Sequence, residues 1–198
     1  MPAQNVFDNL LLQGIRSGYA PAREQEARNW YRDKAQNTKV TAESILQKER
    51  ARYRQTVKPG RMYLFSYDPK HKDTLPFYDR YPLIFMVDTA KDGFYGLNLH
   101  YLPHRLRAKL MDQLYTLVSN QKYDEKTKLR LSYDILKSAS KFRYFKPCFK
   151  HYLGNHVRSR FIEILPSEWD IACFLPLQKF MKATSQEVWK QSKELIKS

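Results

Sequence analysis

The side chains best suited to chemistry in this sequence lie between residues 141 and 152, where basic and aromatic residues alternate. Five aromatic rings are interleaved there with four cations, namely Lys141, Arg143, Lys146 and Lys150. Proteins that bind single-stranded nucleic acid use such cations as phosphate contacts and such rings as stacking platforms for bases. The rings also recur at intervals of three and four residues, which is typical of a helix with a buried face. The residues concerned are Phe142, Phe145, Phe149 and Tyr152, with Gly154 as the stop of the helix.

Two further groups of cations are candidates for contact with phosphates. Arg158 and Arg160 alternate in a predicted strand, which places both on one face of a sheet. Arg105, Arg107 and Lys109 lie near the start of a helix predicted to begin at Pro103. These five residues and the four cations of the 141–152 stretch form the predicted nucleic-acid-binding set.

The net charge supports an anionic partner. The 198 residues carry 35 Lys and Arg against 20 Asp and Glu, a formal charge of +15. Residues 103–165 alone hold 14 Lys and Arg against 5 Asp and Glu. A surplus of this size repels itself in the folded state, so an anionic partner is expected, and nucleic acid is the commonest one. An acidic protein neighbour, a ribosome or a membrane surface would attract the same charge.

No strong enzymatic signature is present. The sequence lacks a glycine-rich phosphate loop, a two-cysteine metal knuckle, a Gly-x-Ser-x-Gly elbow and a His-Glu-x-x-His motif. His100 and His104 are four residues apart, but Pro103 between them prevents one helix from presenting both. All five histidines are therefore interpreted as surface or structural residues, and no catalytic residue, metal or cofactor is predicted.

The most distinctive local stretch is Tyr78-Asp79-Arg80-Tyr81-Pro82. Its Asp and Arg could form a structural pair at the entry to a strand, which is the favoured interpretation, or could orient a substrate phosphate. The other carboxylates of this region lie in predicted turns, where Asp is favoured by hydrogen bonds from its side chain to the backbone.

Cysteine usage and hydropathy indicate a protein of the cytoplasm. Cys148 and Cys173 lie in apolar surroundings and are predicted to be two buried thiols, since nothing indicates an oxidising compartment. The longest apolar run covers residues 83–87, far fewer than the ~20 residues that span a bilayer. No secretory signal is recognisable in the first residues, Met-Pro-Ala-Gln-Asn.

Residues 1–57 are predicted to form a helical N-terminal arm. Three helices are expected, at about 6–14, at 22–37 and from an N-cap at Thr41. The second is very polar, with Trp30 and Tyr31 as almost its only large apolar groups, so by itself it should bury little. An extended arm that lies on a neighbouring molecule is therefore expected.

Residues 58–198 are predicted to form an α+β domain. Strands are expected within 59–102, with a hairpin turn at Lys91-Asp92-Gly93, and a closing strand at 156–165. A helical insertion fills residues 103–154. Helices follow at 166–198, the last opened by a capping box of Thr184 and Glu187.

The start of this domain resembles a known small barrel. Pro59-Gly60-Arg61-Met62-Tyr63 through Tyr81-Pro82-Leu83-Ile84-Phe85 is similar to the opening of SH3-like barrels, a layout that PemK-like toxin ribonucleases share over roughly 40 residues. The resemblance implies a small SH3-like β-barrel with inserted and flanking α-helices. In a PemK-like endoribonuclease, Arg80 or Arg61 would stabilise phosphate charge.

A broader resemblance covers about residues 28–190 and is to proteins of T-even-like tailed phages. It is carried by Tyr67-Asp68-Pro69-Lys70, Leu75-Pro76-Phe77-Tyr78-Asp79-Arg80, Gly96-Leu97-Asn98-Leu99-His100-Tyr101-Leu102-Pro103, Leu106-Arg107-Ala108-Lys109 and Glu168-Trp169. It implies a virion protein or a protein associated with packaged DNA, without naming the component.

The predicted function is therefore a non-enzymatic phage protein that docks into a virion or nucleoprotein assembly. Its basic face would contact DNA or an acidic protein neighbour. Other phage structural proteins are the expected partners in a hetero-oligomeric assembly, in the virion and, during assembly, in the host cytoplasm. The alternatives are a PemK-like endoribonuclease and a free protein that binds DNA ends.

Overall fold

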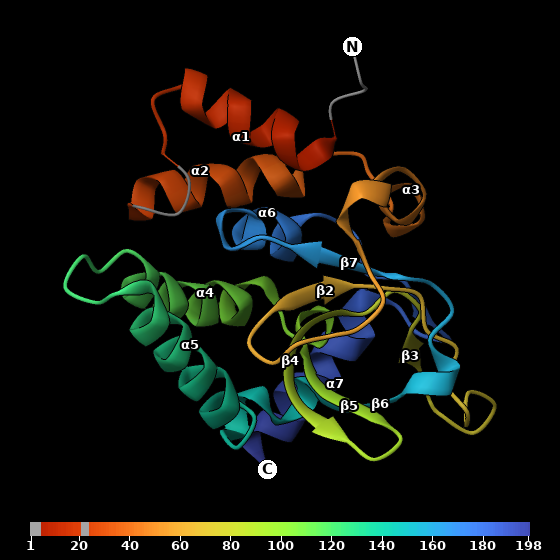
Figure 1. The fold of residues 1–198 in the computed structure, drawn as a ribbon. Helices are drawn as coiled ribbons and strands as arrows, with labels where there is room; N and C mark the ends of the chain where they lie inside the picture. Colours follow the sequence, from red (N-terminus) through yellow and green to blue (C-terminus); the bar gives the residue numbers. More distant parts are fainter. Residues whose placement is uncertain (1–4, 21–23) are drawn as a thin grey trace.

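The chain forms an antiparallel sheet of six strands with helices packed around it (Figure 1). The computed structural model describes residues 5–20 and 24–198, so the start of the second predicted helix and the first four residues lie outside the described parts. The sheet contains β1 (Tyr53–Arg54), β2 (Met62–Leu64), β4 (Leu83–Ala90), β5 (Gly93–Asn98), β6 (Phe149–Leu153) and β7 (Phe161–Ile164). Two short strands, β3 (Tyr78–Asp79) and β8 (Phe180–Met181), pair separately.

The strand order is β1-β7-β2-β4-β5-β6. The predicted strands at 59–102 and the closing strand are confirmed, since β7 pairs with β2 and β4 forms a hairpin with β5. The fold is α+β, because helices pack around this sheet. The described strands run from β1 at one edge to β6 at the other, and no closed barrel is seen. The SH3-like closure predicted from the first strands is therefore not established.

Seven α-helices are present in the described residues. They are α1 (Val6–Arg16), α2 (Gln25–Gln36), α3 (Ala42–Lys48), α4 (His104–Val118), α5 (Glu125–Ala139), α6 (Trp169–Phe174) and α7 (Ser185–Lys197). The capping residues predicted from the sequence act as expected, because Thr41 accepts from the amide of Ser44 and Thr184 and Glu187 form a capping box. Five short 3₁₀ turns join these elements: η1 (Arg50–Arg52), η2 (Leu99–Tyr101), η3 (Arg143–Cys148), η4 (Gly154–His156) and η5 (Pro166–Glu168).

Both faces of the sheet are buried, because alternate residues of each strand point to opposite sides. Met62, Leu64 and Phe85 enter the main core beneath the helices. Tyr63 and Phe65 enter a smaller, largely aromatic cluster on the other face. Cys148 and Cys173 are buried free thiols, as predicted.

The N-terminal helices belong to the main core, which differs from the predicted arm. Phe7, Tyr31 and Ile45 lie in the same buried cluster as the sheet residues, and α1 and α2 stack on α6 in Figure 1. Helix α2 approaches α6 closely because its buried face carries the small residues Ala27 and Ala35. The proposed boundary at residue 57 stays a prediction, although β1 pairs across it with β7.

The helix predicted over the basic and aromatic stretch is wrong. Residues 143–148 form the 3₁₀ turn η3, and residues 149–153 form β6 at the edge of the sheet. Pro147 accounts for the difference, because it has no amide proton and cannot continue an α-helix. The rings consequently divide, with Phe145 and Tyr152 buried and Phe142 59% exposed.

Within the described residues, no helix is both long and apolar enough to cross a membrane.

Candidate nucleic-acid interface

The predicted cations do not form a single face. Arg105 and Lys109 are exposed on the first half of α4, and Lys141, Arg143 and Lys146 are exposed on the chain between α5 and β6. Lys109 lies with its Nζ 5.2 Å from the centre of the Tyr144 ring, which joins these two groups. The Nε of Arg143 donates to the carbonyl of Ile196 near the end of α7. The structure therefore brings α4, η3 and α7 together around one basic region.

A groove of about 1030 Å³ runs through this region, between α2, α4, Tyr144 and the end of α7. We call its four exposed cations the groove cations; they are Arg105, Lys109, Lys193 and Lys197. None of them forms an ion pair with a carboxylate of the described residues. Tyr144, whose ring Lys109 contacts, lies beside them and is 53% exposed. The groove thus combines unpaired positive charge with a flat aromatic surface.

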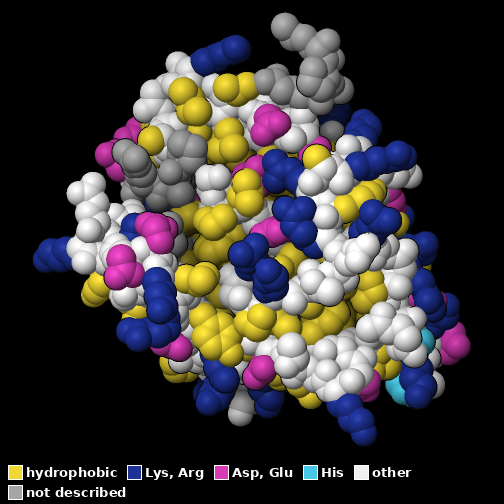
Figure 2. Space-filling model, viewed as in Figure 1, with side chains coloured by type: hydrophobic (Ala, Val, Ile, Leu, Met, Phe, Trp, Pro, Cys, Tyr) yellow, Lys and Arg dark blue, Asp and Glu magenta, His cyan; other side chains and the backbone are white. Residues whose placement is uncertain are grey.

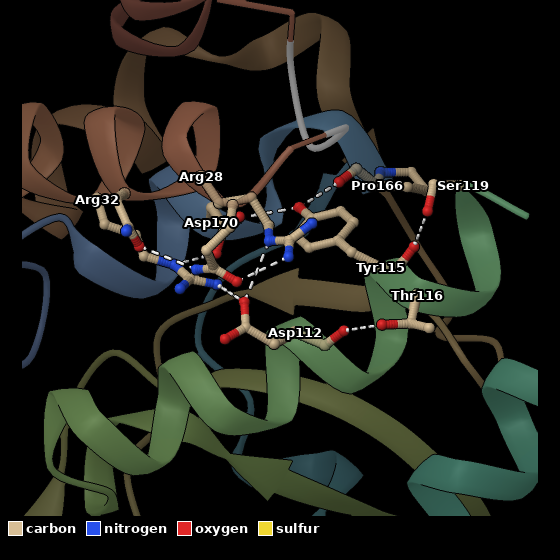
Figure 3. Close-up of polar contacts among 10 residues, drawn as sticks. Arg28, Arg32, Asp112, Tyr115, Thr116, Ser119, Pro166 and Asp170 are labelled. Carbon is tan, nitrogen blue, oxygen red and sulfur yellow. Dashed lines mark hydrogen bonds and ion pairs between the residues drawn. The ribbon is translucent and has the colours of Figure 1, made fainter.

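One carboxylate lines the groove, and protein cations already neutralise it. Asp112 Oδ1 accepts from Arg28 Nε at 3.1 Å and from Arg32 at 2.7 Å (Figure 3). It therefore does not cancel the charge that the groove presents to an anion.

The same ion pairs fasten the walls of the groove. Arg32 Nε donates to Asp170 of α6 at 2.8 Å, so this single guanidinium ties α2 to both α4 and α6 (Figure 3). Tyr115 of α4 extends the network, because its hydroxyl donates to the carbonyl of Pro166 at 2.7 Å and accepts from the amide of Asp170. Burial raises the pKa of Asp170 to about 6, although Arg32 opposes the shift.

Arg107 was wrongly placed among the predicted DNA contacts. It is fully buried, and its guanidinium donates to the carbonyls of Leu102, Cys173 and His100. Its neighbours Arg105 and Lys109 point outward, because residues two positions apart on a helix lie on different faces. Arg107 therefore holds α4 to α6 and cannot reach a phosphate.

Lys150 also lies apart from the groove. It is only partly exposed, with its Nζ 4.1 Å from the centre of the Tyr101 ring, in a separate pocket. The prediction that Lys150 contributes to an exposed basic helix is therefore wrong, since it belongs to β6 and faces that pocket.

A match to a family model covers residues 5–192, and the family is described as the phage T4 terminal DNA protecting protein. The chain belongs to this family. The match confirms the resemblance to T4-like phage proteins over nearly the whole chain, including α4 and the buried network. Lys193 and Lys197 lie just beyond the matched range. Searches of curated proteins and of solved structures found no match.

In this member of the family of terminal DNA protecting proteins, Arg158 and Arg160 lie away from the groove. They precede β7 rather than belonging to it, so the expected strand face does not form. Arg158 is 3.7 Å from Asp68, and Arg160 lies over the Tyr53 ring at 5.8 Å. Figure 2 shows Lys and Arg side chains scattered over the visible side of the molecule, with Asp and Glu side chains among them.

We call Arg54, Arg61, Arg158 and Arg160 the second basic area, and part of its charge is neutralised. Glu163 of β7 accepts from Arg54 at 2.8 Å and from Arg61 at 2.6 Å. The groove is therefore the better candidate for a strong phosphate contact, because its cations have no such partner in the described residues.

Lys193 and Lys197 are absent from the set of contacts predicted from the sequence. Their spacing of four residues on the last predicted helix was a usable signal, since it places both on one face. Residues 166–198 have a low net charge, which directed the prediction to other segments. Only the folded structure shows that this helix lines the same groove as α4. Tyr144 is one of the five aromatic rings of residues 141–152 and lies outside the four that were predicted to share a buried helix face.

The Asp79-Arg80 pair predicted in the sequence does not form. Asp79 is buried and accepts from the amide of Tyr81, from Asn98 and from His100, whose Nδ1 is 2.7 Å away. Arg80 is exposed, with its guanidinium 5.9 Å from the centre of the Tyr81 ring. The described residues contain no group of three or more His, Cys, Asp or Glu placed to hold a metal ion.

Proposed function

We propose that this chain binds the ends of linear duplex DNA through the groove and shields them without cleaving them. The observation that carries the proposal is the set of four groove cations, unpaired within the described structure, beside the exposed Tyr144 ring. The family description supports DNA ends as the ligand.

An end fits this geometry better than the interior of a duplex does. Cations bind the phosphate backbone anywhere along DNA, whereas only an end presents the flat face of a base pair to an aromatic ring. Tyr144 and the adjacent Phe142 provide such rings, at 53% and 59% exposure. More than half of each of these residues faces solvent.

The protein acts in a phage nucleoprotein assembly, in the virion or in the host cytoplasm, and other phage structural proteins are proposed as further partners. The remaining basic area near Arg158 and Arg160 is a second surface for DNA or for an acidic neighbour. The endoribonuclease alternative is disfavoured, because Arg61 is held by Glu163 and Arg80 lies over Tyr81.

A binding experiment with two DNA forms tests the proposal. A short linear duplex is compared with a dumbbell of the same sequence, whose ends are closed by covalent loops. Tighter binding of the linear form is expected, and this preference should fall when the groove cations are replaced by Gln. Equal affinity for the two forms would overturn the assignment to ends.

A matched control variant separates the groove from overall charge. It replaces one Arg and three Lys by Gln outside the groove, as the groove variant does inside it. These exposed residues are Lys91, Lys122, Lys126 and Arg130. The control should retain the preference for linear DNA, because nonspecific attraction depends on net charge whereas recognition of an end depends on the groove.

A further inference from the structure

The described structure contains a second pocket, of about 680 Å³, next to the sheet. It lies between the β5–β6 pair, the segment that leads into β3, and α7. Its volume falls within the range of roughly 300–1,000 Å³ that is usual for small-molecule sites. Of the cations predicted from the sequence to contact nucleic acid, Lys150 alone lines this pocket.

Lys150 provides the positive charge of this pocket. Its ammonium lies 4.1 Å from the centre of the Tyr101 ring and forms no ion pair with the described carboxylates. Burial lowers the pKa of Lys150, as expected for a cation that has lost water without gaining a counter-ion. A bound anion would supply that missing charge.

The buried carboxylate of the pocket does not compete for this role. Asp79 has its oxygens occupied by three protein donors, which are Asn98, His100 and the amide of Tyr81. Asn98 also donates to the hydroxyl of Tyr152 at 3.1 Å, so the floor is a rigid polar network. Asp92 also lines the pocket, where its side chain is 61% exposed and lies 3.0 Å from His151 Nε2. Among the partly buried charges of the pocket, that of Lys150 is therefore left to meet a ligand.

The walls of the pocket are suited to a planar ring. Phe77, Tyr78 and Tyr101 line it, and Phe77 and Tyr101 already contact each other at 6.0 Å between ring centres. Lys70 stands at the exposed rim, where it extends the positive charge toward solvent. Aromatic walls with a cation are the features by which proteins bind a nucleobase and its phosphate.

Helix α7 connects this pocket with the groove. Gln191 and Leu195 line the pocket, whereas Lys193 and Lys197 line the groove. Residues 191 and 195 lie on one face of a helix, and residues 193 and 197 lie on nearly the opposite face. The end of α7 therefore stands between the two sites.

We propose that this pocket takes the terminal nucleotide of a DNA end, with its 5′-phosphate on Lys150 and its base against the aromatic walls. The shared chemistry is that of a nucleoside 5′-monophosphate. The inference rests on the proposed function, because it requires the groove to hold the duplex. Helix α7 then stands between the duplex in the groove and the nucleotide in the pocket.

The test compares linear duplexes that carry a 5′-phosphate or a 5′-hydroxyl. Wild-type protein should bind the phosphorylated form roughly tenfold or more tightly, as expected for a hydrogen bond between charged groups. Lys150→Met should lose this preference and bind the two duplexes with equal affinity. The matched control is Lys91→Met, an exposed lysine that lines neither the groove nor the pocket, which should keep the preference.

A wild-type protein that binds both duplexes equally, or a Lys150→Met variant that keeps the preference, would overturn the pocket assignment. Either result leaves end binding by the groove intact if linear DNA still binds better than the dumbbell. Titration with free deoxynucleoside monophosphate tests whether the nucleotide in the pocket belongs to a DNA end or is a free nucleotide. Competition with the phosphorylated duplex is expected, and saturable binding without competition would assign the pocket to a free nucleotide instead.

Discussion

Replacing Arg32 by Met tests how the N-terminal helices are attached. The Arg32 side chain is 8% exposed and joins Asp112 of α4 to Asp170 of α6, whose side chain is 5% exposed. Met keeps much of the apolar volume but leaves Asp170 without its cation. Breaking a buried ion pair in this way costs about 3–5 kcal/mol. At about 2–4 °C per kcal/mol for a chain of this size, Tm should fall by about 6–20 °C.

The loss should depend on pH in a defined direction. The pKa of Asp170 is raised to about 6 by burial even with Arg32 present, and removal of the cation raises it further. A carboxyl group whose folded pKa is raised favours the protonated folded state, so its penalty shrinks as pH falls below that pKa. Arg32→Met should therefore lose less stability at pH 5 than at pH 7.5.

Thermal unfolding followed by circular dichroism at these two pH values measures the effect. Lys34→Met, an exposed position on the same helix, is the control and should change the free energy of unfolding by less than about 0.5 kcal/mol. Asp170→Asn added to Arg32→Met should restore part of the loss at pH 7.5. A Tm for Arg32→Met within about 2 °C of wild type would refute the reasoning, since ~3 kcal/mol predicts more.

Salt dependence, thiol reactivity, acid stability and strand pairing provide four more tests. The groove variant should flatten the slope of log affinity against log salt by roughly three to four, because each phosphate contact on a duplex contributes about 0.9; an unchanged slope would place the contacts elsewhere. Burial raises the pKa of Cys148 to about 12 and also that of Cys173, so a thiol reagent should label neither cysteine until the protein is unfolded, and rapid native labelling would contradict their burial. Burial lowers the pKa of His104 to about 4, so wild-type protein should lose stability as pH falls from about 6.5 to 4. His104→Asn should lose less stability than wild type over that interval in urea titrations, and a greater loss for the variant would contradict this prediction. Gly93→Ala should lower Tm, because a Cβ there would collide with the carbonyl of Tyr152 across the β5–β6 pair, and an unchanged Tm would show that the strands separate at no cost.

The sequence predicted elements whose signals are local. The hairpin at residues 91–93, the caps at Thr41 and Thr184, and the helix after Pro103 each depend on a few adjacent residues, and all are present. The stretch at 142–152 failed for a physical reason, because its helical spacing of aromatic residues outweighed Pro147 in the prediction. A strand at the edge of a sheet is defined by its partner, here β5, which lies some 50 residues earlier.

The candidate site was harder to predict because charge alone does not reveal burial. Arginine side chains are mostly exposed in proteins, yet Arg28, Arg32 and Arg107 are buried with carboxylate or carbonyl acceptors from other elements. Lys193 and Lys197 lay in a segment with little net charge and enter the groove only because α7 packs beside η3. Tertiary contacts, absent from any local pattern, decided both outcomes.

Protection of a linear duplex from a processive exonuclease tests the central claim most directly. Full-length strands should persist when wild-type protein or the control variant is bound, and should be degraded when the four groove cations are replaced by Gln. The measured quantity is the fraction of strands that remain intact with time at equal fractional occupancy. Equal protection by wild type and the groove variant, or no protection by wild type, would contradict the account.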